Sequence, residues 1–569
     1  YQILLAKHDS SARPYPLHAG SIALTAGTPV TQTLNVPLVR PGFDSLVFRL
    51  SQGGREVLCQ VIPFLLNEEY IEVRPSFLKS TVELRTKLEQ LKGKFGTDFR
   101  GRLRVTAPSG AVVAELPASE QGADPVPFPR DNPAGTYTAE LLNAKDGARV
   151  DSRTFYYPGV GEWEKQTFDN RIIPPFTPVD TVGGPGTLEA HVWGRSYTWR
   201  NSLLPTQIVT QEEDLLATPA TLEIDGAPLP AAAFAAGSSA PHRAEFTAHI
   251  KTDAYELDET GWIEYDGVQH GTFILKALKD LKGVEVKVTL PAARVEFLHT
   301  SYDYNWGTKR TETVAKGYRQ TFRFYPCVWL GDYEKGLCIF AESNATWKSE
   351  PSRAVTLTHD GVSAVYTVTL ANELRAGETL PFDLGFLATP VRPLPRNYPL
   401  NTFSDHYSAG MNRPGRRPTA YFILADAAWA GLGGFFCDLP SPADSPSAPL
   451  FRQHIAAIRA GGAKGAPYMM ARFLSEEYPE VAAFKNTWRL SPEQTLDYEQ
   501  QGRKHRVTEI CAFSSGSDFF MWRLKDYLKR IPSDGVYYDF GLPPWCNNAE
   551  HGCTGRSTML GNREFLRRT

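Results

Sequence analysis

Three charged side chains in the last third of the chain each follow a short, mainly apolar run. They are Asp438, Arg472 and Asp539. If the runs are parallel strands, these side chains lie at the carboxyl ends of the strands, where (β/α) barrels do their chemistry. Most glycosidases place two carboxyl groups about the bond that they cleave, one as acid and one as nucleophile or base. A carboxylate at one of these strand ends could take one of these roles, and we predict Asp539 as a catalytic carboxylate.

Asp539 suits the nucleophile or charge-stabilising role, because an ionised carboxylate can face the developing oxocarbenium charge. The alternative is an aspartate that caps the turn after its strand. We expect Asp438 to hydrogen-bond sugar hydroxyls, with a purely structural role as the alternative. Glu476 and Glu477 could supply an acid from a loop, but an exposed charge cluster accounts for them better.

Aromatic residues make up 12% of the chain. Flat rings with one polar edge suit the faces of sugars, although aromatic residues are also common in β proteins for packing alone. We predict that the substrate is bound by residues around the strand ends, namely Tyr468, Arg472, Tyr538 and Trp545, together with Asp438.

Cys546, His551 and Cys553 lie close together in the sequence after Asp539. They have the composition of a soft-metal site. A disulfide that closes a short loop between Cys546 and Cys553 is favoured over this in an exported protein, and free thiols are the third possibility. The seven cysteines cannot all pair within one chain, and no Cys-x-x-Cys pattern is present. The prediction therefore assigns the protein no metal and no cofactor.

The elements around these residues predict a parallel α/β structure. Leu450–Ala460 and Ser517–Arg530 have helical spacing, and the apolar runs Ala466–Phe473 and Val536–Tyr538 read as buried strands. Helix, tight turn and buried strand together form the repeating unit of a parallel sheet or barrel. Residues 396–569 are therefore predicted to be the first half of a (β/α)8 barrel, which the chain does not complete.

The residues before the barrel are predicted to be β-sandwiches, because short alternating runs are separated by Pro and Gly. We divide them into a β-rich segment over 1–68, a small immunoglobulin-like sandwich over 69–160 and a large sandwich over 161–395. The large one contains a distinctive hairpin, in which two apolar strands flank the polar turn between Gly331 and Gly336. The fold class is thus multi-domain, β followed by α/β.

The hairpin Trp329-Leu330-Gly331-Asp332…Gly336-Leu337…Phe340-Ala341-Glu342-Ser343…Trp347, followed by a barrel that opens near Tyr398, resembles glycoside hydrolase family 123. The resemblance covers roughly residues 162–569. It implies a large sandwich before a (β/α)8 catalytic barrel, a carbohydrate substrate, and a secreted, periplasmic or cell-surface location. The run Asp534-Gly535-Val536-Tyr537-Tyr538-Asp539 looks like a strand end that carries a catalytic carboxylate in barrel glycosidases.

The chain departs from the family at one point. Family 123 enzymes cleave β-linked N-acetylgalactosamine with an adjacent Asp-Glu pair, in which the Asp orients the substrate's acetamido group and the Glu is the acid. Here Asp539 is followed by Phe540, so the pair is absent. The substrate-assisted mechanism and the N-acetylgalactosamine specificity are therefore not carried over. The second carboxylate is expected beyond Thr569, in the rest of the barrel.

Composition excludes several other classes of function. The net charge of −3 gives no basic surface for nucleic acid, and no apolar run approaches the length of a membrane span. Neither a Gly-x-Ser-x-Gly elbow nor a His-Glu-x-x-His helix of a lipase or protease is present. The chain begins at Tyr1, not at Met, and is expected to be part of a longer protein. The prediction is a glycoside hydrolase acting on a complex glycan or polysaccharide, and the alternative is a carbohydrate-binding or surface scaffold protein with a degenerate barrel.

Overall fold

A computed structural model describes residues 1–6, 15–25, 27–28, 30–31, 33, 45–63, 69–301, 310–392, 403–404, 420–423, 448–500 and 503–569. The chain forms two compact units. The first contains Tyr1–Pro75, Lys79–Pro129 and Gly135–Phe155, and the second contains Ser76–Leu78, Arg130–Ala134 and Tyr156–Thr569. The predicted boundary near residue 160 thus lies close to the change of unit, while the four-domain division stays a prediction.

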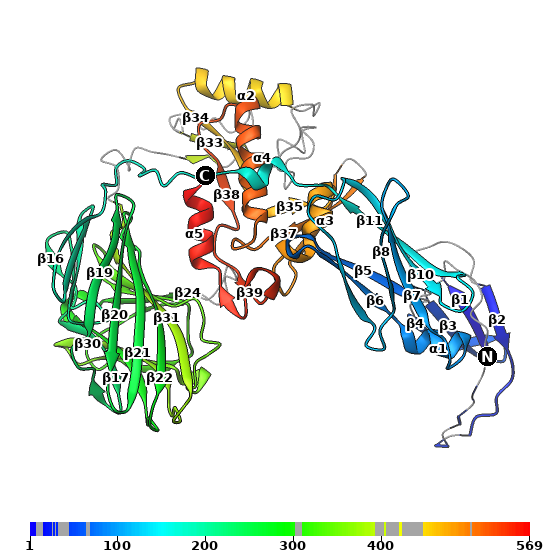
Figure 1. Ribbon diagram of the computed structural model, residues 1–569, viewed down its shortest axis with the longest axis horizontal. Coiled ribbons are helices and arrows are strands. Elements are labelled where there is room, and N and C mark those ends of the chain that lie inside the picture. Colours follow the sequence, from blue (N-terminus) through cyan, green and yellow to red (C-terminus); the bar gives the residue numbers. More distant parts are fainter. Residues whose placement is uncertain are drawn as a thin grey trace. The chain divides into compact units, whose positions relative to one another are not determined.

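The first unit consists of antiparallel sheets with one short helix (Figure 1). Strand Gly101–Thr106 buries every second residue, as a strand with one face on a core must. The elements are β1 (Gln2–Ala6), β2 (Tyr15–Ala19), β3 (Ser45–Gln52) and β4 (Arg55–Pro63) in one sheet; β5 (Ile71–Ser76), β6 (Thr81–Thr86) and β9 (Ala123–Pro127) in another; β7 (Gly101–Thr106), β8 (Val112–Pro117), β10 (Gly135–Asn143) and β11 (Arg149–Tyr157) in a third; and helix α1 (Leu88–Phe95).

The second unit begins with a large β-sandwich, drawn in green in Figure 1. Residues of its sheets pack into a single hydrophobic core, which includes the buried side chains of Trp199, Phe246 and Phe386. The nine-stranded sheet runs β19 (Ala233–Ala240), β20 (Arg243–Lys251), β21 (Tyr255–Glu264), β22 (Gln269–Ala277), β31 (Thr379–Thr389), β28 (Gly336–Phe340), β27 (Cys327–Gly331), β24 (Phe297–Ser301) and β25 (Arg310–Thr313). The six-stranded sheet runs β18 (Ala227–Pro228), β17 (Thr218–Ile224), β23 (Val284–Pro291), β30 (Ser363–Ala371), β29 (Val355–His359) and β26 (Arg319–Phe322). A five-stranded sheet runs β12 (Asp180–Gly184), β13 (Thr187–Val192), β14 (Arg195–Arg200), β15 (Gln207–Thr210) and β16 (Glu213–Asp214).

The predicted hairpin is confirmed as β27 and β28, which pair antiparallel from Cys327↔Phe340 to Gly331↔Gly336. Its two glycines lie against the indole of Trp329. A Cβ atom at Gly331 or Gly336 would overlap that ring and a backbone carbonyl. Glycine is therefore required at both ends of the turn by close packing.

After the sandwich the chain changes from successive strands to strands that alternate with helices, as predicted. Helix α2 (Ala448–Ala460) ends at Gly461–Gly462, and helix α4 (Gly516–Arg530) buries Phe519, Phe520 and Leu524 on one face. The other elements are β32 (Phe403–Ser404), β33 (Ala420–Ile423), β34 (Lys464–Met470), β35 (Phe473–Ser475), α3 (Pro479–Trp488), β36 (Thr495–Gln500), β37 (Arg503–Glu509), β38 (Tyr537–Asp539), β39 (Trp545–Cys546), β40 (Arg556–Ser557) and α5 (Met559–Arg567).

The strands of this region form a parallel sheet in the order β32-β33-β34-β38. Helix α2 lies between β33 and β34 in the sequence, and α4 precedes β38, so the βαβ units of a parallel sheet are present. Between β34 and α4 the chain inserts a small antiparallel sheet, β35-β37-β36, together with α3. The predicted half-barrel is not confirmed by this four-stranded sheet. None of the helices in the part of the chain that the structure describes is long and apolar enough to cross a membrane.

Candidate active site at the strand ends

The carboxyl ends of β34 and β38 lie side by side. Met470 is the register partner of Asp539, and the amide of Ala471 donates to the carbonyl of Asp539 at 2.8 Å. The structure therefore brings the backbones of two predicted site residues, Arg472 and Asp539, to the same edge of one sheet. Asp438 lies outside the described residues.

Both strands leave the sheet through a left-handed residue. Arg472 has φ 66° and Phe540 has φ 55°. Non-glycine residues adopt this conformation at a cost, and such residues cluster at functional sites. Two residues with an unfavourable backbone conformation therefore follow neighbouring strands at this edge of the sheet.

The Arg472 side chain is completely buried, and its guanidinium holds this edge together. It pairs with Glu509 of β37 at 2.9 Å and donates to the carbonyls of Phe540 at 2.8 Å and Leu542 at 3.0 Å. It also donates to the Asn562 side chain on α5. These contacts make Arg472 a positioning residue for the loop after Asp539, and none of them leaves it facing solvent. A direct contact with substrate stays a prediction.

Asp539 itself is half-buried, and its Oδ1 accepts from the amide of Phe540 at 2.8 Å. Asp534, the first residue of the predicted strand-end motif, lies before the opposite end of β38. There its carboxylate accepts from the Arg459 guanidinium and from the amide of Gly465. Arg459 lowers the pKa of Asp534 below its usual range. Of the two acids, Asp534 anchors the start of the strand and Asp539 ends it.

The remaining predicted substrate contacts are dispersed. Tyr538 packs between Phe520 of α4 and Phe565 of α5, and burial raises its pKa. Trp545 is partly buried against the sandwich core. For Tyr468 only the backbone is described, and it pairs with Tyr537. The packing of Tyr538 and Trp545 is that of core aromatics, so their contact with substrate stays a prediction.

The glutamates of the neighbouring loop lie in ion pairs and turns. Glu476 Oε1 accepts from the Lys485 ammonium at 2.6 Å and from the Thr508 hydroxyl. The amide of Glu477 donates to Ser475 Oγ at 3.2 Å.

A cavity of about 710 Å³ lies elsewhere, lined by residues 166–169, helix α4 and the last two residues, and Asp539 is not among the residues that line it.

The hairpin motif has a defined contact with the α/β region. The buried carboxylate of Glu342 pairs with Arg556 and accepts from the amide of Leu560 at 2.8 Å. The backbone carbonyl of Glu342 accepts from the amide of Ser557 at 2.7 Å. Residues of the sequence motif thus bind the segment that follows Asp539.

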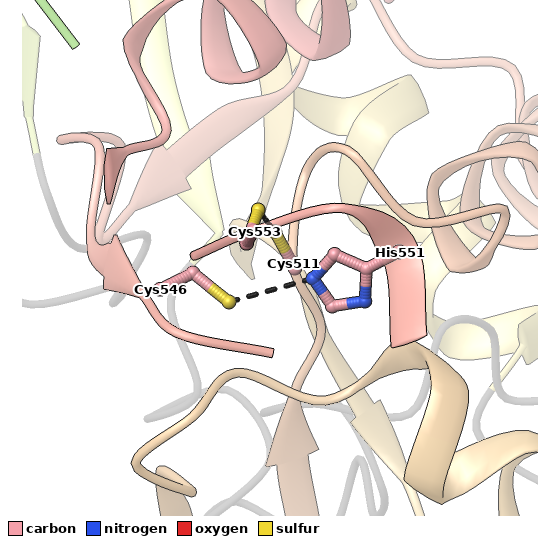
Figure 2. Close-up of side chains that lie close together, drawn as sticks. All are labelled: Cys511, Cys546, His551 and Cys553. Carbon is pink, nitrogen blue, oxygen red and sulfur yellow. Dashed lines mark hydrogen bonds between the residues drawn. The ribbon is translucent and has the colours of Figure 1, made fainter. Parts of the chain in front are cut away.

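The predicted disulfide between Cys546 and Cys553 is wrong. Both thiols are free and buried, and their sulfurs lie within 4.8 Å of the ligand atoms of Cys511 and His551 (Figure 2). Hydrogen bonds from the Cys511 and Cys553 thiols lower the pKa of Cys546. Sequence reasoning missed Cys511, because it lies two residues after β37 and far along the chain from the other three.

Comparison with known families supports the reading of the sandwich. Residues 189–345 match the model for the third domain of glycoside hydrolase 123. The resemblance to this family is confirmed over these residues. The match ends just after the hairpin β27–β28, so it includes the glycine-flanked turn and Glu342. No curated protein sequence matches the chain.

Solved structures with local similarity include several carbohydrate-active proteins. The galactosidase domain of the α-galactosidase–sucrose kinase AgaSK has 10% identity and a TM-score of 0.29, covering 68% of this chain and 70% of its own. Galactose 1-epimerase from Lactobacillus acidophilus NCFM has 7% identity and a TM-score of 0.26, and the match covers 37% of this chain and 98% of the epimerase chain. The α-galactosidase AgaB from Geobacillus stearothermophilus has 10% identity and a TM-score of 0.29, and the match covers 63% of this chain and 65% of the AgaB chain. At these scores the similarity carries no argument about this site.

Proposed function

We propose that the protein is a glycoside hydrolase that acts on a complex glycan or polysaccharide, with Asp539 as its nucleophile or charge-stabilising carboxylate. The match of residues 189–345 to a glycoside hydrolase domain supports the reaction class. The location of Asp539 supports the role of this residue, because it ends a parallel strand beside the end of a second strand. Export to the periplasm, cell surface or medium is part of the proposal and rests on the family resemblance.

The surroundings of Asp539 favour a fixed carboxylate. The loop that follows it is held by the buried Arg472 through two of its carbonyls. A catalytic group is effective when its neighbours hold it in position before the substrate arrives. Glycoside hydrolysis also requires a second carboxyl group beside Asp539.

The test uses the full-length protein and a panel of aryl glycosides and polysaccharides. Asp539→Asn should lower turnover by roughly 100- to 10,000-fold on whichever substrate the wild type cleaves. Asp526→Asn is the matched control, since Asp526 is a carboxylate on helix α4 that pairs with Arg530 of the same helix. It should retain wild-type turnover.

A second variant separates the two roles of the carboxylate. If Asp539 is the nucleophile, azide should rescue Asp539→Gly on an activated aryl glycoside. Azide nitrogen then bonds to the anomeric carbon as the phenolate leaves, giving a glycosyl azide of inverted configuration. A charge-stabilising Asp539 gives no such product. Near-normal turnover in Asp539→Asn would overturn the proposal, and glycan binding without hydrolysis by the wild type would favour the scaffold alternative.

A further inference from the structure

Four potential metal ligands come together on the side of α3 and β37. The sulfurs of Cys511 and Cys553 lie 3.9 Å apart, and Cys546 Sγ lies 3.4 Å from His551 Nε2. All four ligand atoms lie within 4.8 Å of one another. The three cysteines are completely or almost completely buried, and Figure 2 shows the four side chains close together, with Cys546 facing the ring of His551.

These separations suit one tetrahedral ion. Zn–S bonds of about 2.3 Å and a Zn–N bond of about 2.0 Å place ligand atoms about 3.8 Å and about 3.5 Å apart across a tetrahedron. The observed 3.9 Å and 3.4 Å agree with these values. A disulfide instead requires sulfurs about 2.05 Å apart. The arrangement is therefore that of a cage and not of a cystine.

The histidine is prepared to act as a ligand. The Nδ1 atom of His551 lies 2.8 Å from the backbone carbonyl of Thr487. A carbonyl only accepts hydrogen bonds, so Nδ1 carries the proton and Nε2 keeps its lone pair. That lone pair is on the nitrogen that faces Cys546. A hydrogen bond from the distal nitrogen to a carbonyl is the usual support for a metal-bound histidine.

Hydrogen bonds hold the turn that carries Cys546, His551 and Cys553. Asn548 caps the short helix η8 (Ala549–His551) through Glu550 N and donates to the carbonyls of Asn486 and Arg489. Gly552, at φ 80°, turns the chain back so that the amide of Cys553 donates to the carbonyl of Asn548. The amide of Asn548 also points at Cys546 Sγ at 3.4 Å, which stabilises a thiolate.

We propose that Cys511, Cys546, His551 and Cys553 bind one zinc ion in a closed structural site. The three cysteines bind as thiolates and the histidine as a neutral imidazole, so the bound cluster carries a net charge of −1, and protons held by the thiols before binding pass to solvent. Four protein ligands leave no open coordination position, which separates this site from a catalytic zinc. The ion ties β37 to a loop 42 residues further along the chain. The inference stands independently of the proposed hydrolase activity.

The first test measures metal content by mass spectrometry of the full chain, purified without chelators. We expect about one zinc ion per chain, and loss of nearly all of it in Cys511→Ser and His551→Gln. Cys59→Ser is the control, since Cys59 is an exposed cysteine in the first unit, and it should retain the metal. Absence of zinc from the wild type after refolding with zinc would overturn the proposal. Retention of zinc in Cys511→Ser, or iron in place of zinc, would do so as well.

A second test needs no variant and therefore does not depend on whether a mutant folds. Titration of the wild type with a mercurial thiol reagent, in the presence of a zinc-sensitive dye, should release the ion as the three buried thiols react. Non-reducing mass analysis should find these three cysteines as thiols. A disulfide between any two of them in the freshly purified protein would overturn the proposal.

Discussion

The guanidinium of Arg472 and the carboxylate of Glu509 lie 2.9 Å apart, and neither side chain has any exposed surface. The pair connects the end of β34 to the end of β37, and Arg472 extends it to the loop after Asp539. Two opposite charges can be buried here because each is paired with the other, and Arg472 donates in addition to two backbone carbonyls. This relationship, more than any residue that faces solvent, fixes the edge on which the proposed site depends.

Breaking this pair should be strongly destabilising. Arg472→Met leaves the Glu509 carboxylate buried without its cation, and we expect a loss of about 3–5 kcal/mol in the free energy of unfolding. Denaturant unfolding monitored by tryptophan fluorescence gives the value. The double variant Arg472→Met with Glu509→Leu should recover a large part of it. An equal loss in the single and double variants would show that packing, and not charge, holds the edge.

The exposed pair of Arg506 and Asp497 on β37 and β36 is the control, because it also joins an arginine to a carboxylate, at 2.7 Å. Both side chains are more than half exposed. Solvent screens such pairs, so Arg506→Met should leave the unfolding midpoint nearly unchanged. A large effect here would contradict the distinction between buried and exposed pairs.

The α/β region should lose stability in acid, because the stabilising charge of Asp534 is lost there. Its pKa is lowered in the folded protein by Arg459, so the stability that it contributes is present above the pKa of an unfolded aspartate, about 3.9, and is lost as the pH falls through the folded value. Asp534→Asn should cost about 1 kcal/mol at pH 7, because the pair is partly exposed. The cost should shrink as the pH approaches 3. A cost that stays constant over this range would exclude the ion pair as its source.

Glu259 should have the opposite effect on the pH dependence of stability, and should make the folded protein less stable as the pH rises. It lies inside the sandwich on β21, and neither of its carboxylate oxygens has a hydrogen-bond partner among the described residues. Burial raises its pKa well above the usual range. The folded state therefore holds a proton that the unfolded chain releases above about pH 4.3, and stability falls as the pH rises from there toward the folded pKa.

Two variants check this expectation. Glu259→Gln should abolish the decline in thermal midpoint as the pH rises above about 4.3, and Glu259→Met should raise stability at pH 7 by about 1–3 kcal/mol. Asp258→Asn alters the neighbouring carboxylate on the solvent face of the same strand and should preserve the decline. A wild type whose stability does not fall across this window would contradict the account.

Much of the fold could be predicted from the sequence because its determinants are local. The alternation of buried and exposed residues in strands such as Val284–Pro291, and the helical spacing that ends at Gly461–Gly462, are properties of neighbouring residues. The hairpin between Gly331 and Gly336 was predictable for the same reason, and its resemblance to glycoside hydrolase family 123 is confirmed over residues 189–345. The strand that ends in Asp539 was also visible as an apolar run followed by a charge.

Only the tertiary structure decided what these side chains do. Arg472 was predicted as a site residue from its place after a strand, and only the fold shows that β37 and α5 pack against it and that its buried guanidinium pairs with Glu509. Cys546 and Cys553 were predicted to form a disulfide because they are near in sequence. The fold brings Cys511 from the end of another strand to the same point, and three thiols with one imidazole then satisfy the geometry of a metal ion and not of a cystine. The order of residues along the chain determined which elements form. Contacts between residues tens of positions apart determined the role of each side chain, because burial and partners arise only when those elements pack.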